Sequence, residues 1–280
     1  MRPLDRDQPA LLTALWERQA EQWELLGRPL RPGEEDIARV QTTIDERLQV
    51  DGDAPTALIL GVTPELVHLR WPDRATVLAT DRSMVMIRGV GPVPGDSVRR
   101  SSVVQTDWMT LPLAGASCDL VVSDGGFANV PGASAAPLAR SIRRVLGPDG
   151  VLTTRMFMRP DDREEPEQVW EELVDGRIGT FSAFKLRLLM ALCGDDGDVC
   201  VADGWEHFQA RGPDIDALAE RLGWDAAAIR TIEAYRGQDT VYWFPTLGQF
   251  RAVVSREFDE QACHWPGYEL GDRCPTFVLR

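Results

Sequence analysis

The sequence predicts an α/β protein with a doubly wound, mostly parallel sheet. Between residues 56 and 158, short apolar runs alternate with stretches of helical periodicity, as expected for buried parallel strands joined by crossover helices. Acidic residues stand at the ends of three of these runs, where sheets of this class bind their ligands. The chain has 280 residues, more than a common single domain, so we expect one domain with an extension and an insertion.

Two amphipathic helices are expected before the sheet. Residues 8–27 place leucines, Trp16 and Trp23 at roughly helical spacing, and a glycine follows as a stop signal. Residues 33–50 repeat apolar side chains at helical intervals until the sequence DGDAP breaks the pattern. Residues 1–52 therefore form a predicted N-terminal helical extension. Its apolar face must be covered, and we expect it to help enclose the ligand site.

Five strands and three helices are expected in the following segment. The predicted strands are ALIL (57–60), TVLAT (76–80), SVVQT (102–106), DLVVS (119–123) and VLTTRMF (151–157). Helices are predicted near residues 64–70, 83–89 and 136–146, and the loop signal GPDG ends the last of them.

The chain changes character after residue 158. Residues 159–245 begin with an acidic stretch and are then mostly helical, so we interpret them as a helical insert. Residues 246–258 predict a helix, and residues 259–280 predict two strands around a glycine-containing turn. The predicted core of the sheet thus comprises residues 53–158 and 246–280.

Composition narrows the class of partner and compartment. With 44 acidic and 30 basic residues the formal net charge is −14, which disfavours a nucleic-acid substrate because binding to phosphate backbones depends on Lys and Arg. The start of the chain is polar, and no apolar run is long enough to span a bilayer, so we expect a cytoplasmic protein without a membrane partner. The five cysteines show no CxxC spacing and the three histidines lie far apart, so no metal site is predicted.

The turn after the first strand, Gly61-Val62-Thr63-Pro64-Glu65, discriminates between two nucleotide cofactors. A dinucleotide brings a pyrophosphate, which needs several glycines and a helix N-terminus free of negative charge, and Glu65 would oppose it. S-adenosylmethionine has no phosphate and carries a sulfonium cation, so this turn is compatible with it. Thr63 as N-cap and Pro64 at the first helical position still give the helix an orderly start.

Two later strand ends carry further ligand-binding candidates. Asp81 follows Gly61 by twenty residues, the separation at which an acid after the second strand meets the ribose hydroxyls of a bound nucleotide. Asp81 has an alternative role as the cap of the helix that begins near Ser83. Asp107 is placed to accept a hydrogen bond from an adenine amine, and the Trp108 ring offers a flat surface against the base.

These motifs, taken in order, resemble the class I S-adenosylmethionine-dependent methyltransferases. LILG is similar to the first motif of that family, LATD to the second and TDWMTLPL to the adenine-binding motif, while CDLVVSDGG and RVLGPDG are similar to the fourth strand and the turn before the fifth. The resemblance covers Thr56 to Met158 and implies a Rossmann-like fold with an antiparallel C-terminal strand. The cofactor-binding residues that it implies are Gly61, Thr63, Asp81, Arg82, Asp107, Trp108, Asp124 and Gly125.

The resemblance implies methyl transfer from S-adenosylmethionine, and we expect the acceptor to be a small molecule held between the strand ends and the insert. Asp124, His207 and Tyr235 are the candidate catalytic bases, although Asp124 in SDGG has an alternative role as a turn former. A sulfonium is already activated, so positioning alone can supply most of the rate. Arg28 or Arg31 of the N-terminal extension is a candidate partner for the carboxylate of the cofactor.

Two other classes of function share this pattern. A nicotinamide-dependent oxidoreductase has the same alternation of strands and helices but conflicts with Glu65 and the missing glycines. A non-catalytic or regulatory protein that binds S-adenosylmethionine on the same fold is also consistent with the motifs, because ligand binding does not require turnover. The sequence gives neither the accepting atom nor the oligomeric state.

Overall fold

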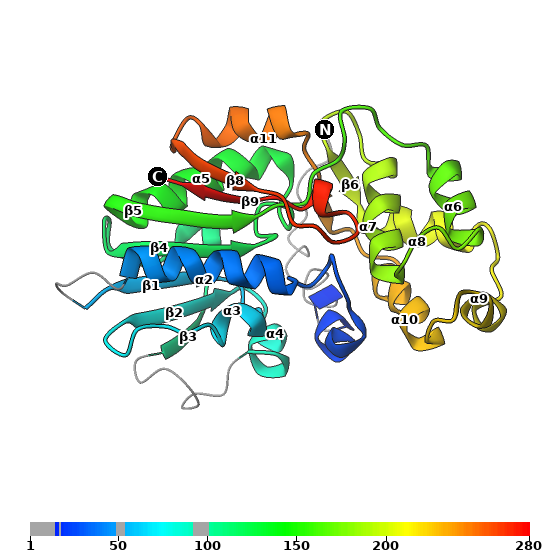
Figure 1. The fold of residues 1–280 in the computed structure, drawn as a ribbon, viewed down its shortest axis with the longest axis horizontal. Coiled ribbons are helices and arrows are strands. Elements are labelled where there is room, and N and C mark those ends of the chain that lie inside the picture. Colours follow the sequence, from blue (N-terminus) through cyan, green and yellow to red (C-terminus); the bar gives the residue numbers. More distant parts are fainter. Residues whose placement is uncertain (1–14, 17, 49–53, 92–100) are drawn as a thin grey trace.

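A seven-stranded sheet forms the centre of the computed structural model, which describes residues 15–16, 18–48, 54–91 and 101–280. The strand order is β3-β2-β1-β4-β5-β9-β8, with β1 to β5 parallel and β9 antiparallel between β5 and β8 (Figure 1). The predicted doubly wound fold with an antiparallel C-terminal strand is therefore confirmed. The strands are β1 (Thr56–Leu60), β2 (Thr76–Asp81), β3 (Ser101–Gln105), β4 (Cys118–Asp124), β5 (Leu146–Arg155), β8 (Glu260–His264) and β9 (Thr276–Leu279).

Helices cover both faces of the sheet, which explains why the central strands are continuous apolar runs. In β1, Leu58 and Leu60 face one apolar cluster while Ala57 and Ile59 face another, and all four are buried. Helices α5 (Gly132–Val145) and α11 (Leu247–Val254) close the first cluster, and α2 (Glu34–Leu48), α3 (Pro64–Val67) and α4 (Met84–Gly89) close the second (Figure 1). None of the described helices combines the length and the apolar character of a bilayer-spanning segment.

Helix α5 begins four residues earlier than predicted. The backbone N–H of Gly132 donates to Oδ1 of Asp198 at 2.7 Å, so a residue from the insert stabilises the start of this helix. A Cβ at Gly132 would lie 2.7 Å from Nε1 of Trp243, which leaves no room for a side chain. The early start is thus a tertiary effect that local periodicity does not contain.

The segment between β5 and α11 forms a helical region with its own apolar cluster beside the sheet (Figure 1). Its central helix is α7 (Phe181–Leu192), which is buried from Phe181 to Ala191, as expected for a helix surrounded by others. A two-stranded antiparallel sheet and helix α8 were not predicted, because the strands have only three residues each and α8 contains a glycine. The remaining elements are α6 (Pro166–Val174), β6 (Asp198–Cys200), α8 (Val201–Gln209), α9 (Ile215–Leu222), α10 (Ala226–Arg230), the 3-10 helix η3 (Thr231–Tyr235) and β7 (Val241–Trp243).

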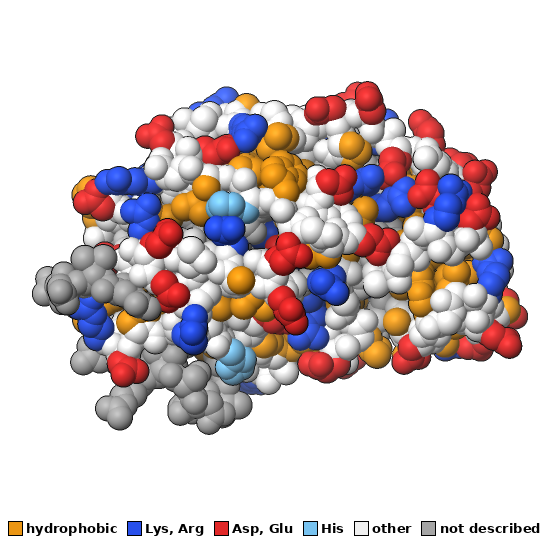
Figure 2. Space-filling view, viewed as in Figure 1, with side chains coloured by type: hydrophobic (Ala, Val, Ile, Leu, Met, Phe, Trp, Pro, Cys, Tyr) orange, Lys and Arg blue, Asp and Glu red, His pale blue; other side chains and the backbone are white. Residues whose placement is uncertain are grey.

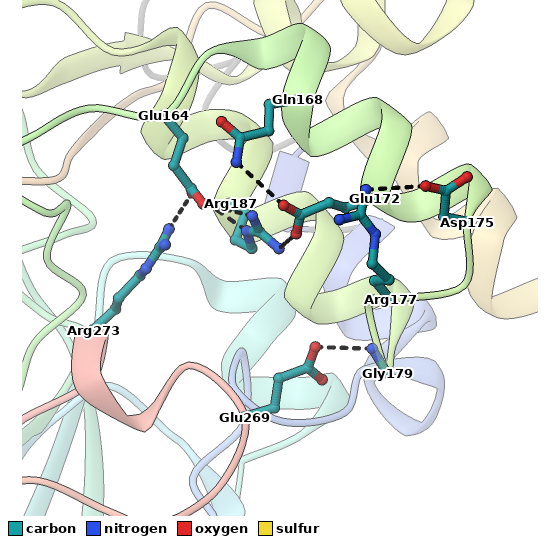
Figure 3. Close-up of polar contacts among 9 residues, drawn as sticks. All are labelled: Glu164, Gln168, Glu172, Asp175, Arg177, Gly179, Arg187, Glu269 and Arg273. Atoms are coloured by element: carbon teal, nitrogen blue, oxygen red, sulfur yellow. Dashed lines mark hydrogen bonds and ion pairs between the residues drawn. The ribbon is translucent and has the colours of Figure 1, made fainter.

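Ion pairs fasten this helical region to the C-terminal part of the chain (Figure 3). Glu164 accepts hydrogen bonds from Arg187 of α7 at 2.5 Å and from Arg273, which precedes β9, at 2.5 Å. Although burial opposes ionisation, these two guanidinium groups lower the pKa of Glu164. Glu269 adds a bond from the backbone N–H of Gly179 at 2.8 Å. The loop between β8 and β9 therefore holds the start of α7 and its partner α6 in place.

The N-terminal extension is described only in part. Within the predicted helix 8–27, residues 15–16 and 18–21 are helical and a 3-10 helix, η1 (Trp23–Leu25), follows, while residues 8–14 lie outside the described part of the chain. Helix α2 confirms the second predicted helix and packs Val40, Ile44 and Leu48 against the sheet.

Lys185 is the only lysine of the chain, and it is buried in the centre of α7. Its ammonium group donates to Thr231 Oγ1 at 2.8 Å and lies 5.4 Å from the centroid of the Tyr235 ring. Burial lowers the pKa of Lys185 from 10.5 to about 7. The unfolded chain therefore binds one more proton than the folded chain between about pH 7 and pH 10.5. Because of this difference, the free energy of unfolding increases with pH over that range.

We expect Lys185→Met to raise the free energy of unfolding near pH 6.5 and to lose roughly 2–3 kcal/mol of that advantage by about pH 9. The reason is that the buried amine destabilises the wild-type native state most below about pH 7, and this penalty decreases steadily as the pH approaches 10.5. Urea unfolding of both proteins at several pH values measures the difference. Arg177→Met, which removes an exposed cation, should show no such trend, and a pH-independent difference for Lys185→Met would contradict the assignment.

Candidate functional site

A cavity of about 910 Å³ opens at the carboxyl ends of the parallel strands. Its walls come from the ends of β1, β2 and β4, from the N-terminal extension and from the helical region. This volume lies near the upper end of the roughly 300–1,000 Å³ that ligand pockets occupy, so the cavity has room for a cofactor and a second small molecule. The lining residues used below are Trp16, Gln19, Trp23, Gly61, Thr63, Asp81, Arg82, Asp107, Trp108, Asp124, Asn129, Ser134, Leu186, Leu189, Tyr235, Tyr242 and Phe244.

The turn after β1 presents backbone to the cavity. Gly61 has a φ of +105°, a conformation that a side chain would strain, and its N–H donates to the Thr80 carbonyl at 2.7 Å. Thr63 is the N-cap residue of α3 but makes no side-chain capping bond, so its hydroxyl is free of that role. The turn thus exposes its backbone to the cavity with a single glycine, where dinucleotide-binding turns usually have several.

The sequence suggested an unpaired negative charge at Glu65, but the structure pairs this carboxylate with Arg31. Arg31 donates from Nε to its Oε1 at 2.6 Å, and the Arg31 guanidinium also lies 5.3 Å from the centroid of the Trp23 ring. The other arginine considered as a partner for the cofactor, Arg28, lies over the Tyr268 ring at 5.6 Å. Because Arg31 is paired with Glu65 and neither arginine lines the cavity, the structure places both away from the expected contact.

Asp81 combines a structural bond with a position on the cavity wall. Its Oδ1 accepts from the Ser83 N–H at 2.7 Å, while Ser83 itself caps α4 by accepting from Met86 at 3.2 Å. The alternative role of Asp81 as helix cap therefore belongs to Ser83. Burial raises the pKa of the Asp81 carboxyl to about 6, because few donors compensate the charge in the protein alone. Hydroxyl donors of a ligand would stabilise the ionised form.

Trp108 is held rigidly beside Asp81. Its indole N–H donates to the Thr80 carbonyl at 3.1 Å, which fixes the ring against the end of β2. Asp107 accepts from the Met109 N–H at 2.9 Å and so caps the short 3-10 helix η2 (Trp108–Thr110). A Cβ at Gly126 would lie 2.2 Å from Ser123 Oγ, so the chain below the ring has no space for a side chain. The ring, the acid beside it and Asp81 form a wall that can take a flat base and a sugar.

Asp124 lines the cavity but is occupied by Arg155. The Arg155 guanidinium donates to its two carboxylate oxygens, at 2.5 Å and 3.1 Å, and both side chains are almost inaccessible to solvent. Gly125 has a φ of +65°, and a Cβ there would lie 2.9 Å from the Phe157 ring. Gly125 is not among the lining residues and instead shapes the loop that follows β4.

Arg155 connects the floor of the cavity to both ends of the chain. It donates to the Pro29 carbonyl at 2.9 Å and to Tyr268 Oη at 3.1 Å, and it forms an ion pair with Asp36 at 3.5 Å. Tyr268 donates in turn to Asp36 at 2.8 Å. Although burial opposes ionisation, the adjacent Asp124 carboxylate raises the pKa of Arg155, so the guanidinium remains charged.

The other two candidate bases differ in position. Tyr235 lines the cavity, whereas His207 lies on α8 and is not a lining residue. The Nε2 atom of His207 is buried without a hydrogen-bond partner among the described residues, and burial together with Arg211 lowers its pKa. His207 is therefore separate from Asp124 and Tyr235, the other two candidate bases, which line the cavity.

Several lining residues were missed by sequence reasoning. Gln19 belongs to the N-terminal helix, Asn129 and Ser134 follow β4, and Tyr242 and Phe244 belong to the β7 segment. The sequence signals for these positions were coarse: Gln19 lies in the extension expected to help enclose the site, and Tyr242 and Phe244 lie in the insert expected to hold the acceptor. Within the described ranges, no group of three or more His, Cys, Asp or Glu side chains is arranged to hold a metal ion.

The residues at the strand ends fit S-adenosylmethionine better than a dinucleotide. An acid, a fixed indole ring and an open backbone turn provide what an adenosine needs. Of the described lining residues only Arg82 is basic, and it is exposed. The described lining therefore offers no cluster of cations that could bind a pyrophosphate.

A comparison with protein families agrees with this fit. Residues 60–154 match the family model of the methyltransferase domain. Among solved structures, a Burkholderia thailandensis 1,6-didemethyltoxoflavin-N1-methyltransferase with bound S-adenosylhomocysteine is 12% identical, with a TM-score of 0.54 over 100% of this chain and 92% of that one. A Rhodobacter sphaeroides protein described as a Zn-dependent alcohol dehydrogenase is 14% identical, with a TM-score of 0.57 over 94% of this chain and 97% of that one.

At such low identity these two structures support the fold alone. A search of curated protein sequences finds no match. The family match covers the strands and turns that carry Gly61, Asp81, Asp107 and Asp124, which is the region where the cavity meets the sheet. Residues 60–154 thus match a methyltransferase domain, on a fold shared with solved methyltransferase structures.

Proposed function

We propose that the protein transfers a methyl group from S-adenosylmethionine to a small-molecule acceptor, chiefly by holding the two reactants in line. The observation that carries the proposal is one continuous cavity, whose lining extends from the strand ends to Tyr235, Tyr242 and Phe244 of the helical region. In this proposal residues 1–52 cover the cofactor, residues 53–158 and 246–280 form the core, and residues 159–245 form the lid that binds the acceptor.

The cofactor would lie along the strand ends. Asp81 would accept from the ribose hydroxyls, Trp108 and Asp107 would hold the adenine, and Gly61 and Thr63 would border the amino-acid portion. When bound, S-adenosylmethionine supplies a methyl group on a sulfonium sulfur that is already activated for displacement. Trp16 and Trp23 of the N-terminal extension also line the cavity, where they would exclude water.

Catalysis by positioning is favoured over catalysis by a strong base. Asp124 is bound by Arg155 through both oxygens, Tyr235 is protonated because burial raises its pKa well above 10, and His207 does not line the cavity. None of the three is therefore a free base beside the cavity. Holding a nucleophile in line with the methyl group would supply the rate instead.

A small acceptor fits the shape and charge of the cavity. Enclosure by the extension and the lid suits a molecule that enters completely, and a single basic lining side chain among the described residues offers no track for a phosphate backbone. The Burkholderia protein was crystallised with the small molecule 1,6-didemethyltoxoflavin, and our proposal gives this chain an acceptor of similar size. We expect a cytoplasmic protein that needs neither nucleic acid nor a membrane.

Turnover is tested by incubating the purified protein with S-adenosylmethionine and a library of small nucleophiles. We expect S-adenosylhomocysteine to form together with a product that is one methyl group heavier, as detected by mass spectrometry. Asp124→Asn should retain measurable activity if no base is needed there. The proposal would be overturned if the protein bound NAD but neither S-adenosylmethionine nor S-adenosylhomocysteine. A methylated RNA or DNA product would also overturn it.

Asp81 should make cofactor binding depend on pH. Its carboxyl has a pKa of about 6 in the free protein, and ribose hydroxyls donate to the ionised form, so binding releases a proton near this pH. We expect the affinity for S-adenosylhomocysteine to rise by about tenfold from pH 5 to pH 7. Asp81→Asn should bind about 10–100-fold more weakly at pH 7 and lose this pH dependence.

Isothermal titration calorimetry in two buffers of different ionisation enthalpy measures both the affinity and the released proton. Asp107→Asn is the matched control, because it removes a lining carboxylate but should keep the rise between pH 5 and pH 7. A wild-type affinity that is constant over this range would remove Asp81 from the ribose-binding role.

A further inference from the structure

The charged lining residues of the cavity all lie at the carboxyl ends of sheet strands. Asp81 and Asp124 are the last residues of β2 and β4, Arg82 and Asp107 come shortly after β2 and β3, and the charge of Asp124 is compensated by Arg155. The lining residues from the helical region, which we call the lid wall, are Leu186, Leu189, Tyr235, Tyr242 and Phe244, and none of them is charged. A charged group placed against this wall would lose its hydration without gaining an ion pair.

Two phenol groups are the polar atoms of the lid wall. Neither the Tyr235 hydroxyl nor the Tyr242 hydroxyl forms a hydrogen bond with the described residues, although Tyr235 is only 2% exposed. Burial raises the pKa of both, and Tyr242 is close enough to raise that of Tyr235 further. Both hydroxyls are therefore uncharged at neutral pH, and each can donate and accept.

These hydroxyls make no hydrogen bond that stabilises the described fold. Neither oxygen is among the fully buried polar atoms that lack a partner, so both are accessible from the cavity that the two tyrosines line. The rings, in contrast, contribute to packing. The Tyr235 ring lies against the Lys185 ammonium group, and the ring centroids of Tyr242 and Phe244 are 6.1 Å apart in an edge contact. Hydroxyls on the wall of a ligand cavity that lack protein partners are suited to a ligand.

Lys185 does not make the lid wall cationic. It is not a lining residue, its ammonium group is bonded to Thr231, and the Tyr235 ring lies against it. The described part of the N-terminal extension also contributes uncharged lining side chains, with Gln19 as its polar member. The acceptor end of the cavity is therefore apolar, aromatic and neutral, with a pair of hydroxyl groups.

We propose that the acceptor is an uncharged, largely apolar ring compound whose polar group hydrogen-bonds to the hydroxyls of Tyr235 and Tyr242. The inference rests on the proposed function, since it assigns the second reactant of the same cavity. The two hydroxyls orient the ring, and the leucines and Phe244 of the lid wall bury its faces. Anionic and cationic ring compounds are excluded by the cost of losing their hydration.

The test uses protein saturated with S-adenosylhomocysteine and a graded set of probes. The set comprises one-ring and two-ring neutral phenols, the matching hydrocarbons, and the matching carboxylates and methylammonium compounds, with binding measured by ligand-observed NMR at neutral pH. We expect the best phenol to bind at least about tenfold more tightly than its charged counterparts. Tyr235→Phe and Tyr242→Phe should each weaken phenol binding by about 3–10-fold and leave the hydrocarbon unaffected.

Both variants should fold, with a melting temperature equal to or above that of the wild type, because neither hydroxyl has a hydrogen-bond partner to lose among the described residues. Trp205→Phe is the matched control: it removes a buried indole N–H that also lacks a partner in the described structure, but it lies outside the cavity lining and should not alter phenol binding.

A preference for a carboxylate or an ammonium probe, binding by none of the neutral probes, or unchanged phenol binding in both tyrosine variants would overturn the inference. Failure of the protein to bind S-adenosylhomocysteine in the first step would instead overturn the proposed function.

Discussion

The buried guanidinium of Arg155 is the interaction on which the arrangement of the site depends. It lies at the end of β5 and binds Asp124 at the end of β4, the Pro29 carbonyl and Asp36 of the N-terminal extension, and Tyr268 of the C-terminal loop. A buried cation is tolerated only when carboxylates and carbonyls replace its hydration, and removing one partner of such a pair typically costs about 3–5 kcal/mol. The extension and the C-terminal loop are therefore fixed to the sheet beside the cavity floor.

The same network explains why a carboxylate at the cavity floor need not act as a base. An aspartate paired with a buried guanidinium through both of its oxygens is held in one orientation, and its charge is balanced by that cation, which favours a positioning role. At Asp36, the effect of burial is the largest and raises the pKa of the carboxyl, although Arg155, Gly33 and Tyr268 stabilise its charged form. Charge around Arg155 thus holds three segments together, while the lid wall of the cavity has no charged side chain.

The family core could be predicted from the sequence to a large extent. Each strand of the parallel sheet appeared within one or two residues of its predicted start, except β5, which begins five residues earlier as it pairs with β4. Gly61, Asp81, Asp107, Trp108 and Asp124 were all expected at strand ends, and all five line the cavity. These positions follow from local rules, because a buried strand must be apolar and a parallel sheet gathers its strand ends along one edge.

What the sequence by itself determined was the sheet, its flanking helices and the acidic residues at its carboxyl edge, since the periods of strands and helices are local properties of a chain. Only the tertiary structure decided the partners: Arg31 with Glu65, Arg155 with Asp124 and Asp36, the start of α5 on Asp198, and Tyr242 beside Tyr235 on the lid wall. The physical reason is that hydrogen bonds and ion pairs act over a few ångströms in space, and these partners are separated by up to 119 positions in the chain.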